Sequence, residues 1–467
     1  MFAGFPFATP YDPSQDPATS VDPLGTTVAA ERLADLLLPG LTARMWRPRL
    51  LTFSVVAALV AARAAELLKQ DDVYETARLA FERLYVAALV RQATGDSELT
   101  DGIRRIPGTD RARAALSRDE PLTRASFLKG QSVNGPTGVM ARLARNLKIV
   151  DDENHLDTSG QGLALAWAKD EGLPGILEGN PAAGDGGKWL TQMAKATQEA
   201  VKGQWPGGQS SLWSSLVDRL RPDRMQKHER KFILAALTSD PAGQRARTLA
   251  LLVDAVETYR EASNEGRSTV ERMVMQNGLR ELLGSDTLDR LLRLVVEAID
   301  AHEECSALLL EAFDTIRWSL SSKGALAEAQ VLADKAVAKA LEKIRKQLTR
   351  QRAVLDAAIT RLIAEPAIDR KVPKLLRQMS DDIAAGLPSS ESFLSALLDR
   401  HRRVQQEKRK GDWIERGDRL TIMPGFGLPE KPPGYAGLYL HPFRIQNAYA
   451  MLNELGVVKV GADEEDA

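Results

Sequence analysis

Apolar residues recur every three or four positions along most of this 467-residue chain, with charged and polar residues between them. That spacing places the apolar side chains on one face of an α-helix. It predicts helices from residue 27 to about 93, throughout 188–321 and along 325–410. Within 188–321, Gly or Pro interrupts the pattern about every 15 to 30 residues, which is typical of an antiparallel helical domain. We therefore predict a mainly α-helical, multi-domain protein.

The first part of the chain predicts an arm and a helical domain. Residues 1–26 hold five prolines and no helical period, which indicates an extended Pro-rich arm. They lack the basic and apolar regions of a secretory signal, so none is expected. We predict an N-terminal helical domain over 27–110. Its longest apolar stretch, Leu50–Ala62, is shorter than the roughly 20 residues that cross a bilayer, so we expect a buried helix and no membrane contact.

Residues 111–170 predict an embedded winged-helix module. The expected elements are helices at 111–117, 121–129 and 137–147, a short β-hairpin over 148–157, and a helix from Thr158. The helix before the hairpin would be the recognition helix, where Arg142 and Arg145 suit groove or phosphate contacts. The acidic turn of the hairpin would repel phosphate, so a protein-docking surface stays open as the alternative.

A helical domain is expected over 188–321, followed by a long basic helical arm over 325–410. Residues 325–364 predict one helix that ends before Pro366. Its apolar residues recur in steps of 3, 4 or 7, as in a coiled coil, at Leu341, Ile344, Leu348, Leu355 and Leu362. This helix would either pack within the chain on helices over 370–407, as a hairpin, or bind a partner.

The last segment, 411–467, predicts a small α+β module, which would be a second, degenerate winged helix. Its expected elements are a strand within Trp413–Pro424, a strand at Leu438–Leu440, a helix over Pro442–Leu455, a strand at Val457–Val460 and an acidic tail.

Charge changes the picture in one region only. The chain has 62 Lys+Arg and 63 Asp+Glu, which excludes a uniformly basic nucleic-acid coat. Residues 335–419, however, carry 20 Lys+Arg against 12 Asp+Glu, a net charge of +8, and the rest of the chain carries −9. Clustered cations suit phosphate contacts, although a solvated helix face is the alternative. The candidate DNA contacts are Lys339, Lys343, Arg345, Lys346, Arg350, Arg352, Arg400, Arg402, Arg403, Lys408, Arg409 and Lys410, besides Arg142 and Arg145.

The search for catalytic and metal-binding motifs yields one weak pattern. A single cysteine, Cys305, excludes an intrachain disulfide and fits the cytoplasm. None of the five histidines stands in a zinc motif, and Gly184–Trp189 lacks the spacing and hydroxyl of a phosphate loop, so no metal or cofactor is expected. Arg221 and His228 resemble the Arg…His signature of helical HEPN-type ribonucleases, but Pro222 departs from the usual polar residue there, and a plain interhelical turn is the favoured explanation.

Three segments of the chain, taken together, resemble one group of proteins. They are Asp22-Pro23-Leu24-Gly25 running into ERLADLLLPGLTARMWRPR, GPTGVMARLARNLKIVDDENHLDTSGQGLALAWA, and LYLHPFRIQNAYAMLNELG. Together they are similar to uncharacterised helical and winged-helix proteins of bacterial anti-phage defence loci, over about a quarter of the chain. The resemblance implies a subunit of a defence complex and specifies no catalytic residues.

These observations predict a non-catalytic, DNA-binding adaptor of a bacterial anti-phage defence or DNA-processing complex. Its partner would be an SMC-like ATPase, a helicase or a nuclease, and self-association is compatible with the sequence. One alternative is a kleisin-like protein scaffold that does not bind nucleic acid. The other is a HEPN-like ribonuclease that uses Arg221 and His228.

Overall fold

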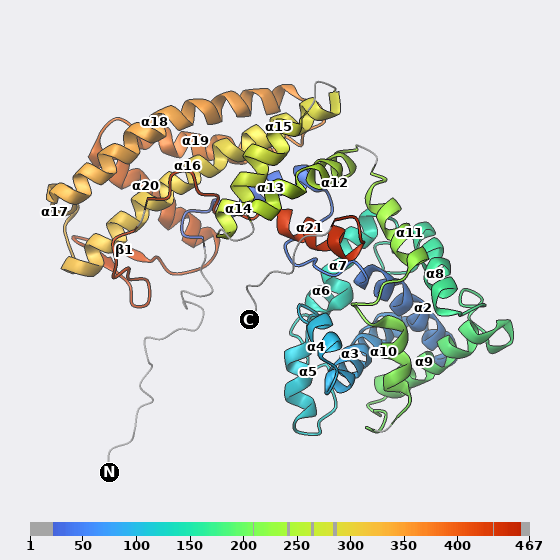
Figure 1. The fold of residues 1–467 in the computed structure, drawn as a ribbon. Helices are drawn as coiled ribbons and strands as arrows, with labels where there is room; N and C mark the ends of the chain where they lie inside the picture. Colours follow the sequence, from blue (N-terminus) through green and yellow to red (C-terminus); the bar gives the residue numbers. More distant parts are fainter. Residues whose placement is uncertain are drawn as a thin grey trace, which may run out of the picture. The chain divides into compact units, whose positions relative to one another are not determined.

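The computed structural model describes residues 22–208, 210–240, 243–262, 266–283, 287–432 and 434–458. Within these ranges the protein is mainly α-helical, so the predicted fold class is confirmed (Figure 1). Three predicted segments lie wholly or partly outside the described residues: nearly all of the Pro-rich arm, the end of the strand at 457–460, and the acidic tail.

The chain forms two compact units, and each combines segments that are far apart in the sequence. Unit 1 comprises Met1–Leu37 and Glu257–Phe443, and unit 2 comprises Leu38–Val256 and Arg444–Ala467. The segment predicted as a C-terminal module, 411–467, therefore contributes to both units.

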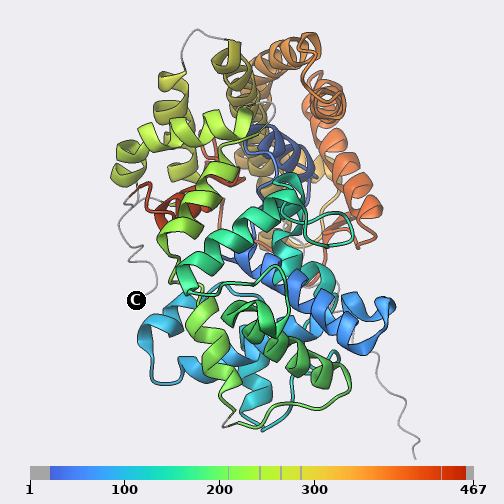
Figure 2. The same cartoon turned by 90° about the vertical axis from the view of Figure 1, so that its right-hand side faces the viewer.

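Unit 2 is built around one apolar helix, α2 (Leu50–Leu68). It packs against α3 (Tyr74–Ala93), α7 (Pro136–Asn146), α8 (Thr158–Glu171) and α9 (Asp185–Val201), which form one bundle in blue to green (Figure 2). Among the described residues, α2 is the one helix long and apolar enough to cross a membrane, but 72% of its most apolar window is buried in the protein. A helix that is apolar on all sides needs such a surrounding, so α2 is a core helix as expected.

The remaining elements of unit 2 are short. They are η3 (Asp71–Val73), α4 (Ser97–Gly102), α5 (Thr109–Leu116), α6 (Gln131–Asn134), η4 (Pro181–Ala183), α10 (Leu212–Leu220), α11 (Lys227–Leu237), α12 (Gln244–Asp254) and α21 (Ile445–Glu454).

Over 111–170 the helices follow the predicted order, and two predicted elements differ in the structure. No helix forms over 121–129. The hydroxyl group of Thr123 accepts a hydrogen bond from the amide of Ser126, and the hydroxyl group of Ser126 accepts one from the amide of Thr123. Such local hydrogen bonds favour a turn. The second helix is instead the single turn α6. The predicted hairpin is reduced to one antiparallel bridge, Val150 with Leu156. Asp157 then accepts a hydrogen bond from the Thr158 amide at the start of α8.

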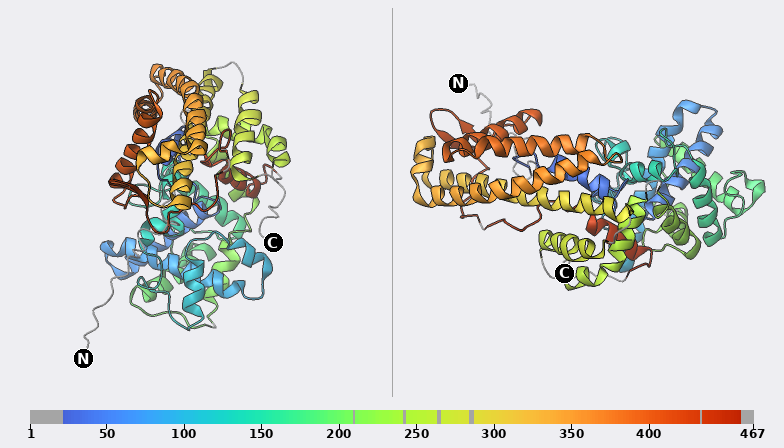
Figure 3. Two further views of the ribbon diagram at one scale, coloured as in Figure 1. Left: turned by 90° about the vertical axis from the view of Figure 1, so that its left-hand side faces the viewer. Right: turned by 90° about the horizontal axis from the view of Figure 1, so that it is seen from above.

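Unit 1 contains four long helices: α16 (Thr287–Lys323), α18 (Lys335–Ala364), α19 (Lys371–Gly386) and α20 (Ser390–Glu407). The yellow α16 and the orange α18 run side by side (Figure 3, right). α18 also packs on α19 and α20, and α1 (Thr27–Leu37) packs on α16 and α19. The five predicted seam residues of α18 are all buried, so the expectation that this helix packs within the chain is confirmed.

One predicted long helix is in fact two helices. Residues 325–364 form α17 (Glu328–Ala333) and α18, with Asp334 between them. The Asp334 carboxylate accepts hydrogen bonds from the amides of Ala336 and Val337, which makes it the N-cap of α18. The other helical elements are α13 (Val256–Glu261), α14 (Arg267–Met273), the π-helical η5 (Val274–Leu279) and α15 (Arg280–Leu282).

After α20 the chain forms a small hairpin. β1 (Ile414–Arg416) pairs antiparallel with β2 (Leu420–Ile422), with Ile414 opposite Ile422, which confirms a strand within Trp413–Pro424. The strand expected at Leu438–Leu440 is absent. The amide of Leu440 binds the Glu303 carboxylate of α16 instead of a neighbouring strand.

The described residues 423–432 and 434–443, here called the strap, lie along α16 and run in the opposite direction. Arg317 donates two hydrogen bonds to the carbonyl of Phe426, and Ser321 accepts one from the amide of Leu428. Further along, the amide of Tyr435 binds Glu311 at 2.8 Å. Side chains of α16 thus satisfy backbone groups of the strap that no strand pairs.

Candidate nucleic-acid interface

The exposed face of α18 carries a row of cations, here called the basic stripe: Lys339, Lys343, Lys346 and Arg350. All four residues are exposed. Their spacing of four, three and four positions keeps them on one side of the helix, within a narrow arc of its surface. At 1.5 Å per residue the stripe is about 16 Å long. The opposite face holds Leu341, Ile344 and Leu348, whose burial fixes which way the stripe points.

Acidic side chains neutralise little of the positive charge of the basic stripe. Lys339, Lys343 and Arg350 make no hydrogen bond or ion pair with any residue that the structure describes. Lys346 lies 3.4 Å from Glu342, and its side chain is still 72% exposed. These cations are therefore available to an anion in solution.

Two other predicted contacts on α18 face inward. Arg345 pairs with Glu342 and donates to the carbonyl of Leu387, beyond the end of α19. Arg352 donates to the carbonyl and hydroxyl of Ser380 on α19. Both guanidinium groups thus join α18 to its neighbour within unit 1.

Most of the predicted cluster on and after α20 is also used internally. Arg400 is buried and donates to the carbonyl of Leu24 at 2.7 Å and to Asp382. Arg403 binds the same Asp382 carboxylate. Arg402 lies 3.7 Å from Asp412. The prediction placed all three in one basic cluster. The fold commits Arg400 to internal contacts, whereas the side chains of Arg402 and Arg403 pair with carboxylates and stay 41% and 40% exposed.

Lys408 has a similar role, since it binds both the carboxylate and the carbonyl of Asp22. Burial alone would raise the pKa of Asp22, but Lys408 and the amides of Thr26 and Thr27 lower it below the usual value. Arg409 is exposed, and Lys410 is half-buried and has an interaction within the protein.

The two arginines of the winged-helix candidate lie on the exposed side of α7. Arg145 donates to the carbonyl of Asp151 and to Asn154, and lies 3.8 Å from the Asp152 carboxylate. The hairpin therefore holds the Arg145 side chain through two hydrogen bonds and one weak, exposed ion pair. Arg142 also has an interaction within the protein.

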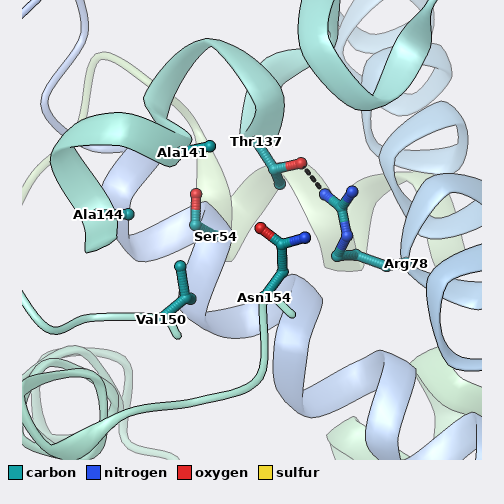
Figure 4. Close-up of a pocket in the computed structure, with 7 residues that line it drawn as sticks. All are labelled: Ser54, Arg78, Thr137, Ala141, Ala144, Val150 and Asn154. Atoms are coloured by element: carbon teal, nitrogen blue, oxygen red, sulfur yellow. Dashed lines mark hydrogen bonds between the residues drawn. The ribbon is translucent and has the colours of Figure 1, made fainter. Parts of the chain in front are cut away.

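The inner side of α7 closes a small polar cavity of about 10 Å³, the space of one water molecule. It is lined by Ser54, Arg78, Thr137, Ala141, Ala144, Val150 and Asn154 (Figure 4). Arg78 donates to the Thr137 hydroxyl, which in turn binds the buried Glu82. Burial raises the pKa of Glu82, although Arg78 and Thr137 oppose that shift. This network ties α3 to α7, and its size excludes an organic ligand.

The ribonuclease candidates are each bound to carboxylates. Arg221 follows α10, is buried, and pairs with Asp96 and Asp223 at 2.8 Å each. The hydrogen bond to Asp223 is the main reason that the pKa of Arg221 is raised. The Nδ1 atom of His228 lies 2.6 Å from Asp170 of α8. Arg221 thus has a structural explanation, the joining of α10 to the start of α4.

The structure brings together three side chains that the sequence treated separately. His302 and Glu303 are neighbours on α16, and His441 belongs to the strap. The Nδ1 atoms of the two histidines lie 3.0 and 2.6 Å from the same Glu303 oxygen, Oε1. Burial would raise the pKa of Glu303, but hydrogen bonds from both histidines lower it to about 2. The sequence signal was a buried-looking His-Glu pair on a helix that also carries Asp300 and Glu304 nearby.

The comparisons with known proteins leave the family open: no family model, no curated protein and no solved structure matches this chain.

Proposed function

We propose that this protein is a non-catalytic, DNA-binding adaptor subunit of a bacterial anti-phage defence or DNA-processing complex. The basic stripe on α18 is the observation that carries the DNA-binding part of the proposal. Four exposed cations, three of them without a partner among the described residues, form one row on a rigid helix.

The physical reason is the match between this row and a phosphate backbone. The stripe places a cation about every 5 to 6 Å along the helix, which lets successive side chains reach successive phosphates. Each contact releases counterions from the DNA and adds to the affinity. Because residues outside 335–419 carry a net charge of −9, the rest of the protein favours no second contact with DNA.

Lysine and arginine on a helix face read no base sequence from a phosphate backbone. We therefore expect the stripe to bind duplexes of unrelated sequence about equally. Sequence choice, if the complex has any, would come from a partner.

The adaptor part of the proposal is supported by the winged-helix candidate. Arg145 is held by its own acidic hairpin, which makes this module a weaker candidate for reading DNA than the basic stripe. Two large apolar side chains are exposed on it, Val133 at 60% and Leu165 at 55%, and we propose these two side chains as candidate contacts for a protein partner. The resemblance to proteins of defence loci suggests the class of partner: an SMC-like ATPase, a helicase or a nuclease.

The direct test is the affinity for a labelled duplex of about 25 base pairs, measured by fluorescence anisotropy at 50 mM salt. A variant with Lys339→Gln, Lys343→Gln and Arg350→Gln should bind at least tenfold more weakly. The matched control is Lys195→Gln, Lys202→Gln and Lys227→Gln, which removes three exposed lysines of unit 2. Equal loss in both variants would refute the assignment of the stripe.

The kleisin-like scaffold is the second candidate, and the exposed Val133 and Leu165 favour it as well. It predicts a stable protein partner and no measurable affinity for DNA. Retention of that partner by the stripe variant, together with an unmeasurable wild-type affinity for duplex, would select the scaffold.

A further inference from the structure

We infer that His302, Glu303 and His441 form a binding site for one divalent transition-metal ion of the zinc type. Each residue offers one ligand atom, and the three atoms lie within 4.8 Å of one another. Two imidazole nitrogens and one carboxylate oxygen are an ordinary donor set for zinc. This site goes beyond the proposed function and does not depend on DNA binding.

The ligands are positioned by two different parts of unit 1. His302 and Glu303 belong to α16, where both side chains are fully buried, and His441 lies 138 residues further along, on the strap. The strap is held against α16 by other contacts, at Glu311 and Arg317 for example. The three ligands are therefore brought together by the fold and do not rely on a metal ion to meet.

The distances between the donor atoms are close to those between the ligands of a zinc ion. The two Nδ1 atoms now lie 3.0 and 2.6 Å from Oε1 of Glu303, which are hydrogen-bond distances. Around a tetrahedral zinc ion the same atoms would be roughly 3.3 Å apart, given bonds of about 2.0 to 2.1 Å. With a metal ion on Nδ1, each neutral imidazole would carry its single proton on Nε2 instead.

The second shell supports two of the three ligands, Glu303 and His441. The other oxygen of Glu303, Oε2, accepts hydrogen bonds from the amides of Leu440 and His441 at 2.6 and 3.0 Å, which fixes the carboxylate and leaves Oε1 for the ion. The Nε2 atom of His441 lies 3.2 Å from the Thr26 hydroxyl, an acceptor for the proton that this nitrogen carries when Nδ1 binds metal. Nε2 of His302 is buried and has no hydrogen-bond partner.

Three protein ligands leave one position of a tetrahedral ion for water. The side chain of His441 is 10% exposed, so the ligand group lies at the edge of the core. A bound ion would join the strap to α16 directly and stabilise unit 1 in proportion to its affinity.

The test uses the full chain, stripped with EDTA and dialysed against micromolar Zn²⁺, with bound zinc measured by mass spectrometry. One zinc per chain is expected. His441→Ala and Glu303→Gln should each weaken binding by at least about 100-fold. His155→Ala and His228→Ala are matched controls, because both histidines are partly exposed and lie outside the cluster; they should keep the full zinc content.

Cobalt gives a readout that needs no variant. Wild-type protein loaded with Co²⁺ should show visible absorption bands of a low-coordinate nitrogen–oxygen site, and Zn²⁺ should abolish them. Wild-type protein that retains neither ion, or a folded His441→Ala variant that retains both, would overturn the site.

Discussion

The carboxylate of Glu303 binds His441 twice: one oxygen accepts the backbone amide at 3.0 Å, and the other lies 2.6 Å from the imidazole Nδ1. These two residues are 138 positions apart in the sequence. Their contact fixes the end of the strap on α16 at the point where the chain leaves unit 1. It also aligns the donor groups from which we infer a metal site.

The first prediction concerns this contact in the absence of metal. Glu303→Ala leaves the amides of Leu440 and His441 and two imidazoles without an acceptor in a buried place. We expect it to lower the free energy of unfolding by about 3 to 5 kcal/mol. Thermal and urea unfolding in EDTA would measure this. The control Glu415→Gln, at an exposed position of β1, should change stability by less than about 0.5 kcal/mol.

The second prediction separates structural cations from the basic stripe. Arg400 is buried and binds Asp382 and the carbonyl of Leu24. Arg400→Ala should cost about 2 to 4 kcal/mol of stability, because it leaves buried acceptors unpaired. The exposed Arg409→Ala should cost almost nothing. If Arg400→Ala keeps full stability but weakens DNA binding as much as the stripe variant, our division of the basic segment is wrong.

The third prediction concerns the seam of α18. Leu348 is completely buried, whereas Val354 on the same helix is 50% exposed. Leu348→Ala should destabilise unit 1 by about 2 to 5 kcal/mol, as deletion of core methyl groups does. Val354→Ala should stay within about 0.5 kcal/mol of the wild type. Similar values for the two variants would mean that α18 does not pack through its predicted seam.

The fourth prediction is a dependence on pH in unit 2. Burial raises the pKa of Glu454 to about 7, although Arg47 opposes the shift. In the unfolded chain this carboxyl titrates near 4.5. Between about pH 4.5 and 7 the folded protein therefore holds a proton that the unfolded chain has lost, so stability falls as pH rises through this window. The full effect is roughly 3 kcal/mol.

Urea unfolding from pH 4.5 to 8 would measure this dependence. Glu454→Gln should flatten it and be more stable than the wild type near pH 8. The exposed Glu178→Gln serves as the control and should keep the wild-type slope. A Glu454→Gln variant with an unchanged pH profile would contradict the role given to this carboxyl.

The sequence allowed the helices to be predicted where burial is periodic, as for α18, because a seam of Leu341, Leu348 and Leu355 needs no knowledge of its partner. It misplaced elements whose backbone groups are satisfied by distant side chains. Leu438–Leu440 has the residues of a strand, but its neighbour is Glu303 of α16 and not another strand. Periodicity within a segment carries no information on such a partner.

The candidate site shows the same limit. Counting charges located the basic segment but could not distinguish Lys343, which is exposed, from Arg400, which is buried against Leu24. That distinction depends on residues hundreds of positions away. The histidine–glutamate group was missed for the same reason, since His441 meets His302 only through the path of the strap.

The salt dependence of duplex binding tests the central claim most directly. If each residue of the basic stripe contacts one phosphate, the logarithm of the binding constant should fall with the logarithm of salt concentration with a slope of roughly −3.6. Neutralising Lys339, Lys343 and Arg350 should reduce that slope to roughly −1, whereas the Lys195, Lys202 and Lys227 control should leave it unchanged. An identical slope for wild type and stripe variant would contradict the account.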